Sequence, residues 1–279
     1  MLANHLKSLL PYVVSESQSA FQFDKAISDN ILVAFETLHH MKIKKKGKEG
    51  FMAMKLDMSK AYDRVEWIFL EQLMQRMGFH GRWVDLVMAT IKSVSYSFFI
   101  NGVPRGFIKP TRGIRQGLSP YLFLLCSNGL NGLLKKAVAR GDSRGFSLCK
   151  NGPQISHLFF ANDSLIFCRA KMGDVQTIQS ALAIYETASE QKINGTKTNL
   201  FFGKSVLEST KTDLKNFLGV PEIKEYEKYL GLSAMVGRKK KGKLYLYKGE
   251  DLGETSRVEG ETFVTSRKGG VIESYCASN

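Results

Sequence analysis

The chain has 279 residues, of which 43% are hydrophobic and 11% aromatic, so it can build a core and wholesale disorder is excluded. Its 40 lysines and arginines outnumber 26 acidic residues, and the formal net charge of +14 indicates a polyanionic partner such as nucleic acid. No apolar run approaches the roughly 18 residues of a membrane helix. The four cysteines lack disulfide or zinc spacing. We expect an intracellular protein, nuclear or cytoplasmic, without a secretory signal.

The first half of the sequence predicts helices around one strand. Residues 1–40 have helical apolar spacing, and a lysine- and glycine-rich loop over 41–50 follows, either as a solvated linker or as a surface that contacts phosphates. Residues 51–58 are typical of a short buried strand that ends at Asp57. The next elements are a helix from Val65 to its stop at Gly78, with Val65, Phe69, Leu73 and Met77 on one face, and a helix over 83–91.

The second half predicts two hairpins separated by a long helix. Residues 95–108 form the clearer hairpin, because Asn101 and Gly102 both tolerate the positive φ of a type I′ turn. Ser119 is expected as the N-cap of a helix that begins at Pro120 and ends near Arg140. The later elements are a hairpin over 154–168 with Ala161, Asn162 and Asp163 between its strands, a helix capped by Asp174 with Val175, Ile178 and Leu182 inward, and a strand over 199–203. This order predicts an α+β domain with a mostly antiparallel sheet.

Three aspartates are candidates for chemistry. Asp57 ends a predicted strand, Asp63 follows in the next turn, and Asp163 lies at the tip of the second hairpin. A strand end that faces a hairpin tip can bring carboxylates together, and two Mg²⁺ ions about 4 Å apart need such oxygen ligands. Taken alone, each aspartate is explained more simply as a cap or a turn residue.

Five segments favour a catalytic role for these aspartates over a role in caps or turns, because they occur in the same order as the motifs of a known family. They are KLDMSKAYDRVEW (55–67), NGVPRGFIKPTRGIRQGLSPYLF (101–123), FFAND (159–163), KINGTKTNLFF (192–202) and KYLGL (228–232). Together they resemble the palm motifs of the reverse transcriptase of plant LINE-type (non-LTR) retrotransposons. ESQSAF and ISDNILVAFETLHHMK, between residues 16 and 42, resemble the preceding finger segment. The resemblance covers roughly residues 1–243.

The resemblance implies a right-hand polymerase, with a ferredoxin-like antiparallel palm sheet, its helices and partial fingers. It implies a partial fingers segment over 1–50, palm and fingers over 51–236, and a basic linker with a tail over 237–279. The implied activity is RNA-directed DNA synthesis, in which a primer 3′-hydroxyl attacks the α-phosphate of a deoxynucleoside triphosphate. The implied cofactor is Mg²⁺, with Mn²⁺ as an alternative. The implied partners are an RNA template, a DNA primer and deoxynucleoside triphosphates, and no membrane.

The resemblance also carries roles onto single residues. Asp57 matches the first metal ligand, and Asp163, the remaining carboxylate of the hairpin motif, is expected as the other catalytic carboxylate and metal ligand. Tyr62 matches the aromatic ring that excludes a ribose 2′-hydroxyl, although an ordinary core tyrosine fits equally. Lys197 matches the lysine proposed to protonate or screen the leaving pyrophosphate. Its interpretation as an ordinary surface lysine is nearly as simple. Asp63 matches a recurrent aspartate that we interpret as structural.

A loop and a finger segment match less completely. Gln116 and Gly117 match the R-Q-G segment beside template and nucleotide, and Arg115 is placed to contact phosphate, but the family's following Asp-Pro pair is missing. Because two residues span up to roughly 7 Å, Gln116 and the start of the next helix cannot both keep their family positions without strain. Lys25 keeps the positive charge of the family's Pro-Gly-Arg segment and is expected to contact template or nucleotide.

The hairpin motif carries the most consequential departure. The family reads F-A-D-D where this chain reads F-A-N-D, so Asn162 is a degenerate catalytic position. An amide oxygen can coordinate Mg²⁺, but one negative charge is lost. Moving Asp163 into that place would turn its side chain to the opposite face of the strand. We expect little or no polymerase activity, because losing one stabilising group costs about 10²–10³ in rate.

The tail and the departures together predict a partial, decayed copy of such an element. Residues 247–278 lack periodicity, and codons that encode them can also encode, in the next frame, a string typical of the region after the palm, which predicts a frameshifted, unstructured tail. Two alternatives stay open: a non-catalytic nucleic-acid-binding remnant that uses the basic runs at 42–48 and 238–243, and a non-functional pseudogene product. Zinc binding and Ser-His-Asp hydrolysis are disfavoured by the spacing of the histidines and the lack of a G-x-S-x-G elbow. The sequence indicates no oligomeric state.

Overall fold

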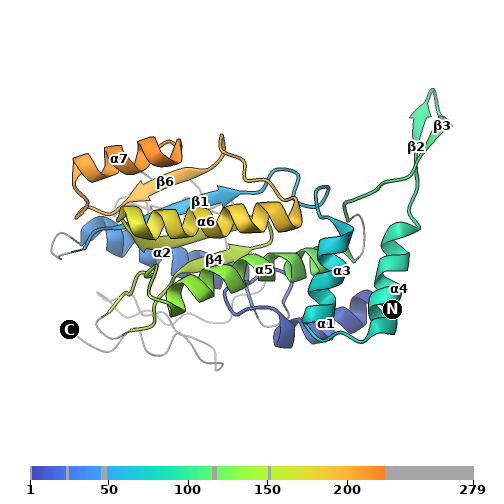
Figure 1. The fold of residues 1–279 in the computed structure, drawn as a ribbon, viewed down its shortest axis with the longest axis horizontal. Coiled ribbons are helices and arrows are strands. Elements are labelled where there is room, and N and C mark those ends of the chain that lie inside the picture. Colours follow the sequence, from blue (N-terminus) through green and yellow to red (C-terminus); the bar gives the residue numbers. More distant parts are fainter. Residues whose placement is uncertain (1, 23–24, 45–48, 115–117, 150–151, 224–279) are drawn as a thin grey trace, which may run out of the picture.

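A four-stranded antiparallel sheet with the order β4-β5-β1-β6 lies at the centre of the computed structural model (Figure 1). The structure describes residues 2–22, 25–44, 49–114, 118–149 and 152–223. Its elements are α1 (Leu2–Val13), α2 (Ile27–Ile43), β1 (Phe51–Asp57), α3 (Trp67–Arg76), α4 (Gly81–Lys92), β2 (Tyr96–Ile100), β3 (Val103–Ile108), α5 (Ser119–Ala139), β4 (His157–Phe160), β5 (Asp163–Arg169), α6 (Met172–Ser189), β6 (Asn199–Phe202) and α7 (Glu208–Leu218).

The sheet brings together segments that are far apart in the sequence. β1 pairs with β5 along its whole length and with β6 on its other side, while β4 pairs with β5. The chain path from β1 through helices to the β4–β5 hairpin, and then through α6 to β6, gives a ferredoxin-like topology. The predicted α+β fold with an antiparallel sheet is therefore confirmed.

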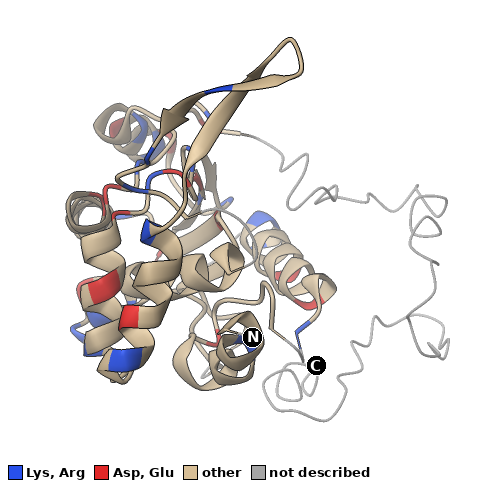
Figure 2. Cartoon of the chain, turned by 90° about the vertical axis from the view of Figure 1, so that its right-hand side faces the viewer, with Lys and Arg blue, Asp and Glu red and all other residues tan. Residues whose placement is uncertain are grey.

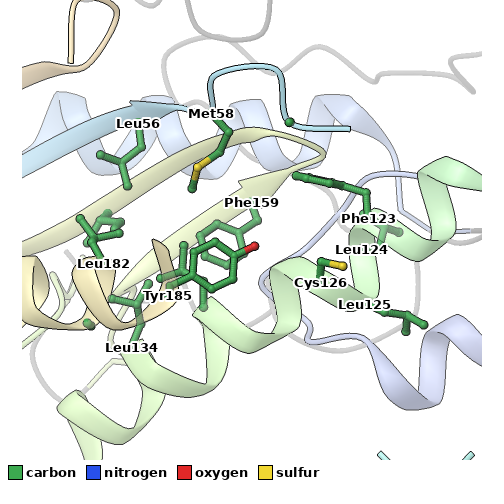
Figure 3. Close-up of a cluster of buried hydrophobic side chains, with 14 of the residues drawn as sticks. Leu56, Met58, Phe123, Leu124, Leu125, Cys126, Leu134, Phe159, Leu182 and Tyr185 are labelled. Atoms are coloured by element: carbon green, nitrogen blue, oxygen red, sulfur yellow. The ribbon is translucent and has the colours of Figure 1, made fainter. Parts of the chain in front are cut away.

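Alternating side chains bury both faces of this sheet. Met52, Met54 and Leu56 of β1 join a cluster with residues of α3, α5 and α6, whereas Phe51 and Ala53 join a second cluster with α2. Figure 3 shows part of the first cluster, in which the sheet contributes Leu56 and Phe159, and the covering helices contribute Phe123, Leu134, Leu182 and Tyr185. Helices therefore cover both sides, while Asp57 at the end of β1 and Asp163 at the start of β5 are only partly buried.

The first predicted strand and the first predicted hairpin are accurate. The hairpin could be predicted because the residues of a tight turn determine its conformation locally. The strand expected over 51–57 and the hairpin expected over 95–108 are confirmed, and Asn101 (φ 50°) and Gly102 (φ 79°) both have positive φ. The second hairpin needs one correction. Phe160 pairs with Asp163, so its turn contains only Ala161 and Asn162, and Asp163 is the first residue of β5 rather than part of the tip.

Both predicted helix caps are wrong. Ser119 is the first residue of α5 rather than its N-cap, which is Leu118. Asp174 lies inside the first turn of α6, where its buried carboxylate accepts hydrogen bonds from the guanidinium of Arg169 and from the backbone N–H of Arg144. In that position Asp174 connects the end of β5 to α6. Its carboxylate pairs with Arg169 and therefore does not cap the helix.

Helix boundaries and buried faces also differ in detail. α3 begins at Trp67, two residues after the predicted start, and its most buried residues are Leu70 and Met74. The helical prediction for the N-terminal part is confirmed by α1 and α2, and α2 continues to Ile43 into the predicted basic loop. None of the helices in the described ranges is both long and apolar enough to cross a bilayer.

The loop after β3 contains a glycine whose conformation no other residue adopts easily. Gly113 has a φ of +89°, and a Cβ there would lie 2.9 Å from the backbone oxygen of Asp63. We predict that Gly113→Ala lowers the free energy of unfolding in urea by about 1–3 kcal/mol. Gly132→Ala, on the exposed side of α5 with no neighbour within 4 Å, is the control and should be neutral or stabilising by up to about 1 kcal/mol. Equal effects of the two substitutions would contradict the prediction.

His157 makes the stability of the sheet depend on pH. It is buried in β4, its Nε2 lies 2.9 Å from the Oδ1 of Asn131, and burial lowers its pKa to about 4, with a smaller contribution from Lys135. Between pH 6.5 and 4 the unfolded chain therefore binds more protons than the folded one. We predict that acidification through this window lowers the free energy of unfolding, by up to about 1.4 kcal/mol per pH unit from this group.

The measurement is the difference between wild type and His157→Gln in urea denaturation at pH 4.5 and pH 7. The variant should lose less stability on acidification, because it has no imidazole to protonate. His39→Gln, at an exposed position on α2, should follow the wild type. Parallel curves for wild type and His157→Gln would show that the buried imidazole does not govern the acid response.

Candidate functional site

A pocket of about 360 Å³ lies where β1 ends. It brings together four residues that the sequence singled out from distant segments: Asp57, Tyr62, Asn162 and Lys197. Asp57 is the last residue of β1, Asn162 lies in the β4–β5 turn, and Lys197 comes from the loop before β6. The remaining described lining residues are Met58, Ser59, Lys60, Ala61 and Asn194.

Asp57 and Asp163 lie opposite each other across the β1–β5 ladder. Directly paired residues share a face, and the alternation along β1 and β5 puts this pair on the side of the sheet that α2 covers further along. Burial raises the pKa of the Asp163 carboxyl; Lys55 opposes this shift and Asp57 adds to it. The predicted convergence of two carboxylates is present. Among the described residues, however, it is Asn162 rather than Asp163 that joins Asp57 in the pocket lining.

Asn194 fixes the carboxylate of Asp57 from the loop that also carries Lys197. Its side-chain amide donates to Asp57 Oδ2 at 3.3 Å, and its backbone N–H donates to the Asp57 carbonyl at 2.8 Å. The hydroxyl of Thr196 donates to Asn194 Oδ1 at 2.7 Å, which sets the orientation of the amide. Asn194 belongs to the KINGTKTNLFF segment, whose pattern predicted no role for this residue.

Tyr62 forms one wall of the pocket and is half-buried. Its ring centroid lies 5.0 Å from that of Phe123 on α5, and burial raises the pKa of its hydroxyl. Its backbone carbonyl accepts a hydrogen bond at 2.9 Å from the N–H of Ile114, in the loop after β3. The residue thus faces the pocket and also packs on the core, so the two interpretations made from the sequence are compatible.

Gln18 holds the turn that carries Asn162, and sequence reasoning missed it. Its side chain is buried, and its Oε1 accepts from the backbone N–H of Ala161 at 3.1 Å and from that of Ala20 at 3.0 Å. Backbone bonds between the flanking segment and Phe159 place this glutamine beside β4. A buried glutamine has no sequence pattern of its own, so only its place within the ESQSAF segment could have indicated it.

The other predicted site residues are not assembled in the described pocket. The ammonium of Lys25 donates to the carbonyls of Glu16 at 2.9 Å and Gln18 at 3.0 Å, and burial lowers its pKa. This lysine therefore supports the loop that contains Gln18, and its contact with template or nucleotide stays a prediction. Arg115, Gln116 and Gly117 lie outside the described residues.

The charges in the pocket favour an anionic ligand. Asp57 is the single carboxylate in the described lining, whereas Lys60 and Lys197 are cationic. Within the described ranges, no group of three or more His, Cys, Asp or Glu side chains is arranged to hold a metal ion. The carboxylate of Asp57 and the amide oxygen of Asn162 are hard donors of the kind that divalent cations prefer, so the donor set fits such a cation in part.

Known proteins resemble this chain in both sequence and fold. A family profile described as reverse transcriptase (RNA-dependent DNA polymerase) matches residues 1–233. An uncharacterized mitochondrial protein of Arabidopsis thaliana is 49% identical over 69 residues, which are 24% of this chain and 57% of that protein. The transposon TX1 uncharacterized 149 kDa protein of Xenopus laevis is 26% identical over 196 residues, which are 70% of this chain and 14% of that protein.

Solved structures of telomerase share the fold. The telomerase of Candida albicans, in complex with a fragment of telomeric RNA, matches with a TM-score of 0.52 at 14% identity over 75% of this chain and 34% of that chain. The telomerase of Candida tropicalis matches with a TM-score of 0.52 at 12% identity, over 73% and 33% of the two chains. These matches confirm the predicted right-hand polymerase fold.

The chain spans less than two thirds of the length of these relatives, at 57% and 14% of the two sequences and about a third of each telomerase chain. The family profile nevertheless covers most of the chain, and the transposon relative agrees with the resemblance to non-LTR retrotransposons. The chain therefore belongs to the reverse transcriptase (RNA-dependent DNA polymerase) family.

Proposed function

We propose that the chain is an RNA-directed DNA polymerase homologue whose catalysis is weak or lost because Asn162 replaces a carboxylate. The observation that carries the proposal is the shared pocket of Asp57, Asn162, Tyr62 and Lys197. Three of these residues match family positions of stated function, and the fourth departs at the position where charge is most needed. The activity, the substrates and the site roles below are part of this proposal.

In the proposed reaction, the primer 3′-oxygen forms a bond to the α-phosphorus of a deoxynucleoside triphosphate, and the bond to the β-phosphate oxygen breaks. The hydroxyl gives up its proton to water, and pyrophosphate leaves. Tyr62 packs against the deoxyribose, where a 2′-hydroxyl would meet the ring. Lys197 lies beside the phosphates and donates a proton to pyrophosphate or screens its charge. An RNA template, in a position that Arg115, Gln116, Gly117 and Lys25 help to set, selects the nucleotide.

Divalent ions, Mg²⁺ or Mn²⁺, would offset the charge of the phosphates and lower the pKa of the attacking hydroxyl. Asp57, with Asn194 holding one of its oxygens, is the residue best placed to hold such an ion, and Asn162 would supply a neutral oxygen from the same pocket lining. Asp163 is a third candidate ligand on the neighbouring strand. We propose that this set binds the ions weakly, because one carboxylate and two lysines leave the described lining with a net positive charge.

The remaining parts of the proposal concern the chain as a whole. Residues 1–50 would contribute fingers and 51–236 the palm with further fingers, while 237–279 would form a basic linker and a frameshifted tail.

A specific observation supports the alternative of a non-catalytic nucleic-acid-binding remnant, namely the net charge of +14. Salt-dependent binding of nucleic acid without any extension by the variants below would favour that alternative.

Restoring the missing carboxylate should restore catalysis. We predict that Asn162→Asp raises the rate of primer extension on an RNA template with Mg²⁺ by about 10²–10³-fold over the unmodified chain. The physical reason is that a second carboxylate adds negative charge where divalent ions and phosphates must be held together. Extension is measured as nucleotides added per unit time on a labelled primer.

Two matched variants make this result specific. Asp57→Asn in the Asn162→Asp background should abolish extension, because it removes the other carboxylate from the pocket lining. Asp163→Asn in the same background tests the adjacent carboxylate separately. The proposal fails if the unmodified chain extends the primer within tenfold of Asn162→Asp. If both stay silent, the defect lies elsewhere than at residue 162, and the missing pair after Gly117 is the next candidate.

Gln18 should affect both stability and catalysis through the turn. We predict that Gln18→Met lowers the free energy of unfolding by about 1–3 kcal/mol, because the backbone N–H of Ala161 loses its buried acceptor. In the Asn162→Asp background it should also slow extension, by up to about 10²-fold, because small displacements of catalytic groups are costly. Gln176→Met, on the exposed face of α6, is the control and should change neither quantity. A stability loss with full extension would show that the turn keeps its position without Gln18.

A further inference from the structure

The β2–β3 hairpin exposes an apolar surface that the polymerase pocket does not use. Figure 1 shows it projecting from the end of the domain, beyond α4. Three phenylalanines are largely exposed, with Phe98 at 62%, Phe99 at 77% and Phe107 at 74%. Ile100, Val103 and Ile108 are exposed as well. An isolated two-stranded hairpin is only marginally stable in water, and clustered exposed rings are typical of a binding surface.

We propose that this hairpin binds a single-stranded nucleic acid, whose bases stack on the three phenylalanine rings and whose phosphates meet the adjacent cations. The identification of the partner as a nucleic acid rests on the proposed function. The contact itself lies outside the described pocket lining and requires no catalysis. Single strands are recognised in this way without regard to sequence, because every base has an aromatic face.

The positive charge of the hairpin and its flanking segments favours a nucleic acid over a protein as the partner. From residue 86 to residue 141 the sequence contains lysines and arginines but no aspartate or glutamate. In Figure 2 the projecting hairpin accordingly has a blue segment and no red one. A surface that combines apolar rings with one sign of charge complements a polyanion that has aromatic bases.

The register of the hairpin places a cation beside a ring. Phe98 pairs directly with Arg105 across the two strands, so the two side chains share a face. A base stacked on Phe98 would therefore have its phosphate within reach of the guanidinium. Phe99 follows Phe98 in the strand and points to the other face, where it pairs with Pro104. Phenylalanine rings are therefore available on both faces of the β2–β3 hairpin.

The loop that follows the hairpin is hydrogen-bonded to the segment that carries Tyr62. After β3, the backbone N–H of Gly113 donates to the carbonyl of Val65 at 2.8 Å, and that of Ile114 donates to the carbonyl of Tyr62 at 2.9 Å. Tyr62 lines the pocket. The loop that follows the hairpin is therefore anchored to a residue of the pocket wall, which connects the proposed binding surface to the pocket through the backbone.

The test is the affinity of the full chain for a fluorescein-labelled 12-nucleotide single-stranded RNA, measured by anisotropy in EDTA so that no polymerisation occurs. Each of Phe98→Ala, Phe99→Ala and Phe107→Ala should weaken binding by about fivefold or more. Replacement of Phe99 by Trp should preserve affinity, whereas Phe99→Leu should weaken it as much as Phe99→Ala, because leucine keeps apolar area but has no aromatic face. Tyr12→Ala, an aromatic residue on α1 that is 86% exposed, is the matched control and should bind as the wild type does.

The cations give a second readout. Arg105→Gln and Lys109→Gln should each reduce the slope of log affinity against log salt by about 0.7. Wild-type affinity in the phenylalanine-to-alanine variants, or in Phe99→Leu, would overturn the proposal. Sedimentation tests the competing partner: if the alanine variants abolish self-association but bind RNA normally, the hairpin is a protein interface and the proposal is wrong. Because the assay contains no divalent ions, an inactive polymerase site leaves its result unaffected.

Discussion

The antiparallel pairing of β1 with β5 is the constraint on which the rest of the structure depends. Its register sets Asp57 opposite Asp163 and places the two-residue turn, with Asn162, beside the end of β1. A shift by one residue would exchange the two faces of β5, so that Leu165 and Phe167 would trade clusters with Ile166 and Cys168 and both clusters would have to repack. The buried clusters on both faces therefore fix the site as well as the fold, and the strand ends are left to carry polar side chains.

Polar contacts from distant segments then hold these strand ends. Gln18 supports the turn from the N-terminal segment, and Asn194 supports Asp57 from the loop before β6. The pocket is preorganised by neutral groups, while its described lining carries one carboxylate and two lysines. The proposed weak catalysis rests on this difference between geometry and charge: the motif residues share one pocket, but its described lining carries less negative charge than two divalent ions would require.

Much of the fold followed from the sequence where local chemistry decides it. The Asn101-Gly102 turn, the buried strand before Asp57 and the helix over 119–139 follow from turn preference and apolar spacing. The cap assigned to Asp174 is wrong because its carboxylate pairs with Arg169. The cap assigned to Ser119 is wrong because the helix begins one residue earlier than expected, with Leu118 as its N-cap. The site residues Asp57, Tyr62, Asn162 and Lys197 came from motif resemblance, and the structure brings them together. Gln18 and Asn194 were missed because hydrogen bonds across the fold have no periodic signature.

The most direct test of the central claim is the affinity of the pocket for Mn²⁺, measured by the electron paramagnetic resonance of free Mn²⁺ in the presence of a non-hydrolysable deoxynucleoside triphosphate analogue. The unmodified chain and Asn162→Asp are titrated side by side. If one missing carboxylate is the defect, Asn162→Asp should bind Mn²⁺ at least about tenfold more tightly, since outer-shell partners of a metal site already change its affinity by about 10–100-fold and a direct ligand should contribute at least as much. Equal affinity and equal stoichiometry in the two proteins would contradict the account, because the charge at residue 162 would then have no effect on the ions.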